Sequence, residues 1–227
     1  MKTGRGNGEP GIFLRAALVL LLAAAMVGVG LALLAPPVGI GLGAAVEANL
    51  ASSGVGNSVT AVLLNFRGYD TLLEIAVLTV ALVGVWALGP APRIEESDAS
   101  PILLAMNGVL IPLVPVICGY LLWVGATLPG GAFQAGAVLA AAGVLFILSG
   151  QRPHVPLPGR SMRWIAIVGL AAFLCVAVGV MNGERRFLEY PPGLAGMLML
   201  LVESAATLSI AVILAGLFIG GRPEGEP

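Results

Sequence analysis

The sequence predicts an all-α, polytopic membrane protein, because apolar residues dominate its composition, charge is sparse, and several apolar segments are long. Of its 227 residues, 58% are hydrophobic and only 10% are charged, and the mean hydropathy is +1.01. A fully solvated surface requires more charge than this. The net charge is −1 and no basic stripe is present, which argues against nucleic acid as a partner and leaves the lipid bilayer as the surroundings.

The chain divides into about six apolar segments, each close to the roughly 20 residues needed to cross a bilayer core. A polar tail, 1–11, is expected in the cytoplasm, and the first transmembrane helix covers 12–35. That helix is longer than the core of a signal peptide. The loop at 38–56 leaves room for a short interfacial helix before the second span. The other spans are expected at 57–88, 102–124, 128–148, 163–181 and 193–219, followed by a C-terminal tail, 221–227.

The distribution of basic residues predicts that both termini face the cytoplasm, since cytoplasmic loops are enriched in Lys and Arg. With the N-terminus inside, eight basic residues lie on the inner side: Lys2, Arg5, Arg15, Arg93, Arg152, Arg160, Arg163 and Arg222. Three lie on the outer side: Arg67, Arg185 and Arg186.

The entrance to the second span carries a cluster of charged residues. Asp70 and Glu74 lie four residues apart, and Arg67 precedes Asp70 by three, so all three share one face of a helix. Carboxylates next to lipid-grade sequence cost free energy unless something compensates them. Two interpretations remain open: a self-neutralised cluster that anchors the helix at the headgroup level, or part of a proton or cation path shared with a partner.

Glu203 lies about ten residues into the last span, which places it near the middle of the membrane. Its own span offers no basic residue, so the carboxyl group must be protonated or paired with a group from elsewhere. We therefore weigh a proton-exchanging role against a protonated glutamate that only links packed helices.

Two other features carry predictions. Pro129, Gly130 and Gly131, followed by Phe133, indicate a tight turn at membrane depth that protein must cover. Pro112 and Pro115 interrupt the third span one turn after Asn107, a pattern that either packs helices or exposes carbonyls to a cation. No His or Cys pair has metal-ligand spacing, and no nucleophile triad or phosphate loop occurs, so neither a resident metal, a cofactor nor an enzymatic activity is predicted.

Two segments resemble one family. Asn65 to Glu74 resembles the D-F-R-x-x-D-T-x-x-E segment at the C-terminal end of the large subunit of Mrp-type multisubunit Na⁺/H⁺ antiporters, which is a separate small (MbhE-like) subunit in membrane-bound hydrogenases. Leu128 to Gly136 resembles the T-P-G-G-G-F-Q-G-G signature of the antiporter's MnhB domain. Asn65, Ala132 and Ala135 depart from these patterns. The resemblance divides the chain into an MbhE-like module at 57–92, similar to the end of the large subunit, and an MnhB-like module at 101–220.

The resemblance implies membership of a cation/proton antiporter-like, complex I-related assembly in the plasma membrane of a prokaryote. It implies that one partner is a large antiporter-like subunit, leaves open soluble redox or other energy-coupling subunits, and makes Na⁺ or H⁺ the transported ion. Asp70 and Glu74 match acidic residues of the family's ion path, with Arg67 and Glu203 as further candidates. The alternatives are a purely structural scaffold and, less favoured because no inverted repeat is found, a stand-alone transporter.

Overall fold

The computed structural model describes residues 12–34, 41–91, 100–150, 159–181, 185–191 and 193–222. Regular structure in these segments is helical, apart from an isolated bridge between Pro90 and Arg222. The predicted all-α class is confirmed. The predicted tail at 1–11, the last residues of the tail at 221–227 and most of the acidic connector at 93–100 lie outside the described residues.

The chain forms two units, residues 1–45 and 46–227. The first contains α1 (Ile12–Leu34), whose apolar side chains are exposed on several faces: the consecutive residues Leu20, Leu21 and Leu22 are 70%, 68% and 63% exposed. A helix that is hydrophobic all round needs lipid or protein around it. The short helix that the sequence allowed before the second span is present as α2 (Leu42–Asn49), which crosses the boundary between the units.

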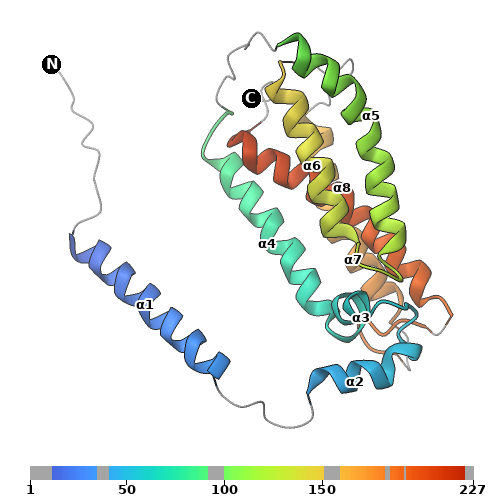
Figure 1. The fold of residues 1–227 in the computed structure, drawn as a ribbon. Helices are drawn as coiled ribbons and strands as arrows, with labels where there is room; N and C mark the ends of the chain where they lie inside the picture. Colours follow the sequence, from blue (N-terminus) through green and yellow to red (C-terminus); the bar gives the residue numbers. More distant parts are fainter. Residues whose placement is uncertain are drawn as a thin grey trace. The chain divides into compact units, whose positions relative to one another are not determined.

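The second unit is a bundle of five long helices that run alternately in opposite directions (Figure 1). They are α4 (Gly68–Ala87), α5 (Pro101–Val124), α6 (Ala132–Leu148), α7 (Gly159–Gly179) and α8 (Ala195–Ile219). The helix α8 makes the most extensive contacts, with α7 and with α6. Its side chains Met199, Val202 and Ile210 are almost fully buried in the main hydrophobic core, beside Phe173 of α7 and Ile75 of α4.

Four of these helices, α4, α5, α7 and α8, are long and apolar enough to cross a bilayer. The helix α6 has 17 residues, and the apolar part of α1 covers 16–32, so these two are shorter apolar helices among the described residues. Ser100 begins α5 by accepting a hydrogen bond from the amide of Leu103 at 3.2 Å, with Pro101 as the first helical residue. Both internal prolines lie within α5, which continues through them.

The expected second span differs from the structure in one respect. Instead of one helix over 57–88, the chain forms α3 (Ser58–Ala61), a π-helical segment η2 (Val62–Phe66), a break at Arg67, and then α4. The apolar residues continue only to Leu64, and Asn65, Arg67 and Asp70 were interpreted as the charged entrance of one continuous helix, so the break was not expected. Figure 1 shows α3 at the end of the bundle where α4 begins and α5 ends.

Candidate functional site

The segment before α4 is fixed to the turn between α5 and α6. Asn57 caps α3 by accepting from the amide of Val59 at 2.9 Å, and its amide group donates to the carbonyl of Leu128 at 2.6 Å. Thr60, one turn later, donates its hydroxyl to the carbonyl of Gly125 at 2.6 Å, and this bond is buried. The predicted modules at 57–92 and 101–220 are therefore joined by direct hydrogen bonds.

The predicted Pro-Gly-Gly turn follows α5 and leads directly into α6. The amide of Gly131 donates to the carbonyl of Leu121 at 2.9 Å, so the turn folds back along the last part of α5. Gly131 has φ of +109°, a conformation that favours glycine, and it is buried together with Ala132. Pro129 is exposed, whereas Phe133 is partly buried against the main core.

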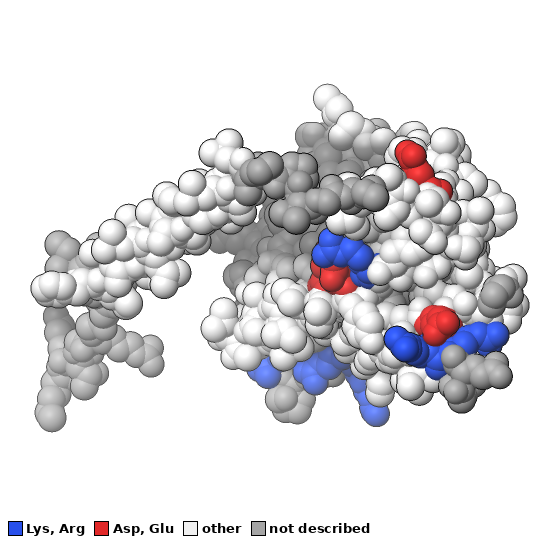
Figure 2. Space-filling model, turned by 90° about the horizontal axis from the view of Figure 1, so that it is seen from below, with Lys and Arg blue, Asp and Glu red and all other residues white. Residues whose placement is uncertain are grey.

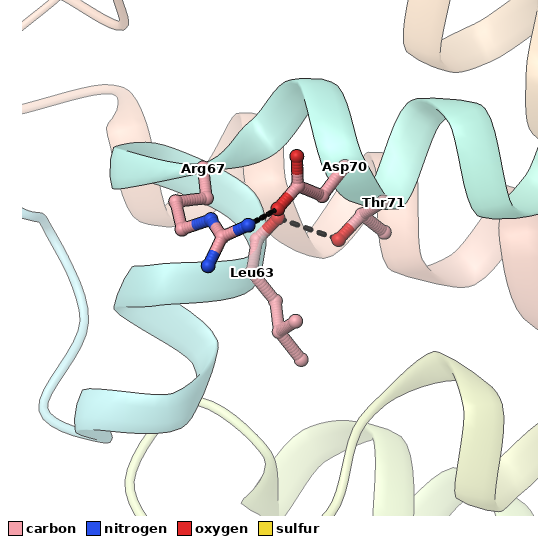
Figure 3. Close-up of polar contacts among 4 residues, drawn as sticks. All are labelled: Leu63, Arg67, Asp70 and Thr71. Atoms are coloured by element: carbon pink, nitrogen blue, oxygen red, sulfur yellow. Dashed lines mark hydrogen bonds and ion pairs between the residues drawn. The ribbon is translucent and has the colours of Figure 1, made fainter. Parts of the chain in front are cut away.

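The break at Arg67 is stabilised by a threonine. The amide of Arg67 donates to the carbonyl of Val62 at 2.8 Å, five residues back, so the carbonyl of Leu63 loses its usual helical partner. The hydroxyl of Thr71 donates to that carbonyl at 2.7 Å (Figure 3). The first turn of α4 is thereby fixed against η2, and the part-buried carbonyl is satisfied.

The charged cluster of the second span is smaller than predicted. Arg67 and Asp70 form an ion pair with side chains 58% and 44% exposed (Figure 3), and Asp70 lies in the first turn of α4, where a negative charge is favourable. A pair this exposed contributes about 0–1 kcal/mol. Glu74 is also exposed and has no ion pair with these two residues among the described contacts, so the three do not form one neutralised group.

A view of the molecule from below Figure 1 shows the visible charged side chains in a few small groups on an otherwise uncharged surface (Figure 2). Most of the visible acidic side chains lie against basic ones. Charge on this face is therefore local, and only part of it is paired.

Glu203 has a different environment. It is 6% exposed, and its carboxyl group accepts a hydrogen bond from the backbone amide of Ala132, the first residue of α6. A helix N-terminus with unpaired amides favours an acceptor with negative charge. The carboxyl is so close to the turn that a Cβ atom on Gly131 would lie 2.8 Å from its Oε1.

The neighbouring hydroxyl groups of α8 do not bind this carboxyl. The hydroxyl of Thr207 donates to the backbone carbonyl of Glu203 at 2.8 Å, and that of Ser204 donates to Leu200 at 2.7 Å. Ser209 donates to the carbonyl of Ala166 and so links α8 to α7. The carboxyl group of Glu203 is therefore directed toward the turn and not toward its own helix.

Glu203 lines a small cavity of about 40 Å³ together with Gly130 and Gly131 of the turn. The opposite wall includes Thr60 of α3 and Thr71 of α4, and the rest is mostly apolar. A cavity of this size holds a water molecule, which requires about 10–15 Å³. Carboxyl, hydroxyl and carbonyl oxygens next to a broken helix are also the groups that coordinate Na⁺ in transporters.

The structure thus brings together two of the sequence predictions, Glu203 and the Pro-Gly-Gly turn. Asp70 and Arg67 do not line the cavity, but Asp70 is adjacent in sequence to Thr71, which does. Glu74 lies on an exposed face of α4. Sequence analysis did not select Thr60 or Thr71 as site residues. Thr71 lies within the segment that resembles the large antiporter subunit, and this resemblance could have identified it as a site residue. No sequence pattern identifies Thr60 as a site residue.

Two further observations concern polar residues. Asn107 in α5 is fully buried, and neither its oxygen nor its nitrogen has a hydrogen-bond partner in the described structure. The sequence alternatives for it, packing or a cation site at the prolines, therefore stay open. No group of three or more His, Cys, Asp or Glu side chains suited to a metal ion occurs in the segments described above.

Known proteins resemble this chain in sequence and in fold. The model of the family described as "Domain related to MnhB subunit of Na+/H+ antiporter" matches residues 102–221. A protein of Rhizobium meliloti (strain 1021), named as a probable K(+)/H(+) antiporter A/B subunit, is 29% identical over 163 residues. The match covers 59% of this chain and 16% of that protein, so the chain spans less than a fifth of this relative.

Two solved structures have a similar fold. A chain of the membrane-bound sulfane sulfur reductase, an archaeal respiratory membrane complex, matches with a TM-score of 0.64 and 23% identity, covering 92% of this chain and 98% of that one. A chain of the Mrp complex from Dietzia sp. DQ12-45-1b matches with a TM-score of 0.64 and 21% identity, covering 100% and 27%. At these identities the likeness concerns the fold alone.

Proposed function

Because this chain belongs to the family of domains related to the MnhB subunit of Na⁺/H⁺ antiporter, we propose that it is a membrane subunit of a multisubunit cation/proton antiporter-like complex. The relative in Rhizobium meliloti is named as a subunit of such an antiporter, and both similar folds come from multisubunit membrane complexes. These names also favour a monovalent cation, Na⁺ or K⁺, exchanged for H⁺ in a prokaryotic plasma membrane. The proposed role is transport, without enzymatic turnover by this chain itself.

The observation that carries this proposal is the buried carboxyl group of Glu203 at a cavity. A carboxyl inside a membrane protein is costly, and such groups commonly mark proton or ion pathways. Here the carboxyl contacts the amide of Ala132 at the start of α6 and faces a water-sized cavity whose lining is mostly apolar. A carboxyl in that position can exchange a proton with a molecule in the cavity.

The surroundings of Glu203 are suited to a passing ion. Thr60 and Thr71 present their side chains on the other wall of the cavity, although each hydroxyl proton is already donated to a backbone carbonyl. Each hydroxyl oxygen therefore retains lone pairs for a water molecule or a cation. We propose that the cavity admits one water molecule or one desolvated cation beside the carboxyl of Glu203.

We also propose that Glu74 lies at the contact with a larger antiporter-like subunit. It lies on a face of α4 where Leu73, Val77 and Val80 are 61%, 67% and 70% exposed. A carboxylate among such residues costs about 2.5–3.5 kcal/mol when it faces lipid at a helix centre. A neighbouring subunit that supplies a basic or hydrogen-bonding group removes that cost.

Purification from native membranes in a gentle detergent, with mass spectrometry of the co-purifying proteins, tests the proposal. We expect recovery of large antiporter-like membrane subunits in constant ratio with this chain. Soluble proteins recovered in the same ratio would identify the energy source. A stable monomer or homo-oligomer without other subunits would contradict the subunit function.

A further inference from the structure

At the opposite end of the bundle from the Glu203 cavity, α4 and α7 enclose a groove of about 570 Å³. One part of its lining is basic: Arg160 and Arg163 from the start of α7, and Arg222 after the end of α8. None of the described lining residues is acidic. The groove is therefore complementary to an anion.

The backbone fixes one of these arginines beside the end of α4. The amide of Arg222 donates to the carbonyl of Gly89 at 2.8 Å, and the amide of Ala91 donates to the carbonyl of Arg222 at 2.8 Å. Gly221 permits this approach, because a Cβ atom there would overlap the backbone of Ala91. The guanidinium of Arg222 is thus attached to a short, well-defined loop at the groove.

Arg160 lies in the first turn of α7, where the helix dipole is positive and the amides have no helical partner. A basic side chain is unfavourable at that position unless an anion binds nearby, and the described first turn contains no acidic residue. The positive end of the helix dipole and the guanidinium groups of Arg160 and Arg222 together favour one negatively charged group at this end of the groove.

The rest of the groove is apolar. Leu82 and Val83 of α4 and Ile167 of α7 line it on the bundle side, below the arginines. Trp86 and Trp164 also line it, and tryptophan is enriched where a membrane protein meets the headgroup layer. A basic end, a tryptophan level and an apolar remainder follow the order of a phospholipid from headgroup to acyl chain.

We propose that this groove binds an anionic phospholipid, with its phosphate at Arg160 and Arg222 and an acyl chain along Leu82, Val83 and Ile167. Basic pockets between transmembrane helices on the cytoplasmic side bind such headgroups, and the distribution of basic residues assigns this end of the bundle to the cytoplasm. This inference does not depend on the ion that the complex transports.

The test uses the intact complex in nanodiscs of phosphatidylcholine with or without phosphatidylglycerol. The groove variant is the double substitution R160Q/R222Q, and the matched control, R185Q/R186Q, removes two arginines at the other end of the bundle. Phosphatidylglycerol retained after exchange into detergent is measured by native mass spectrometry, and the Tm of each variant in pure phosphatidylcholine shows whether the fold is intact.

We expect the groove variant to bind phosphatidylglycerol roughly fivefold more weakly for each arginine removed, and the control to bind as the wild type does. Inorganic phosphate at equal concentration should not raise the Tm, because it lacks the acyl chain. Equal lipid retention by the groove variant and the control would overturn the proposal. So would crosslinking of a photoreactive residue at position 164 to another protein and not to lipid.

Discussion

The amide of Ala132, at the first residue of α6, donates a hydrogen bond to the carboxyl group of Glu203 in the middle of α8. This bond connects the Pro-Gly-Gly turn to the most deeply placed acidic residue of the described structure. The φ of +109° at Gly131 favours glycine, and a Cβ atom there would also displace the Glu203 carboxyl, whose Oε1 would lie 2.8 Å away. The turn and the acid are one structural unit.

Gly131→Ala tests that unit. The new Cβ would lie 2.8 Å from Oε1 of Glu203, and φ of +109° is unfavourable for alanine. We expect a loss of stability of about 1–3 kcal/mol, from strain at an unfavourable backbone conformation, and reduced assembly. Thermal unfolding of the purified complex measures it.

Gly143→Ala, in the same helix, is the matched control. A Cβ at Gly143 meets no atom within 4 Å, so this change should be neutral or stabilising by about 0.5–1 kcal/mol. Equal effects of the two substitutions would show that neither the positive φ nor the contact with Glu203 makes glycine necessary at position 131.

The bond from Thr71 to Leu63 predicts a cost for Thr71→Val. Valine keeps the shape of the side chain but leaves the carbonyl of Leu63 without the hydroxyl of Thr71, its observed partner at the helix break. Because this carbonyl is only part-buried, the loss of its partner should cost about 1 kcal/mol, and Thr71→Ser should restore most of it. The free energy of unfolding in denaturant measures both changes.

Thr79→Val provides the comparison for Thr71. The hydroxyl of Thr79 donates to the carbonyl of Ile75 within the regular part of α4, a carbonyl that the helix itself already satisfies. We therefore expect a change below about 0.5 kcal/mol. If Thr79→Val lowers the free energy of unfolding as much as Thr71→Val does, the bond from Thr71 has no particular importance for the break at Arg67.

The burial of Tyr190 predicts that the stability of the fold depends on pH. Its ring lies in the connector between α7 and α8, its hydroxyl is buried without a hydrogen-bond partner in the described structure, and burial raises its pKa to about 12. In the unfolded chain this tyrosine ionises near pH 10. Its contribution to the free energy of unfolding is therefore fully present below pH 10 and is lost as the pH rises toward 12.

Tyr190→Phe should remove this loss between pH 10 and 12. At neutral pH it should be neutral or stabilising, because it removes an unsatisfied buried hydroxyl. The midpoint of denaturant unfolding at pH 8 and at pH 11 measures both effects. Clear destabilisation at pH 8 would reveal a hydrogen bond to Tyr190 from outside the described residues.

Much of the fold was accessible from the sequence, because apolar length dictates where helices cross a bilayer. The helices α4, α5, α7 and α8 lie where hydropathy predicts them. The break at Arg67 was not predicted, because the polar residues there, Asn65 and Arg67, were interpreted as the charged entrance of one continuous helix. The bond from Thr71 to the carbonyl of Leu63 that compensates the lost helical bond is a contact across the break, which helical spacing does not specify.

The sequence predicted the residues of the site but not the contacts between them. Glu203 and the Pro-Gly-Gly turn were each recognised by residue type, but their contact depends on how α6 and α8 pack, which single-sequence patterns do not specify. The expected cluster of Arg67, Asp70 and Glu74 follows from helical spacing alone. The structure retains only the Arg67–Asp70 pair, because spacing places side chains on one face without fixing which of them form a bond.

The most direct test of the account is antiport by the assembled complex carrying Glu203→Gln, measured as cation-dependent proton movement in membrane vesicles. Glutamine retains an oxygen for the Ala132 amide but cannot exchange a proton, so assembly should persist while the initial rate falls at least about tenfold. Glu47→Gln, on an exposed part of α2, is the control and should transport normally. A full transport rate with Glu203→Gln would contradict the account and leave Glu203 as a cap that packs α6 against α8.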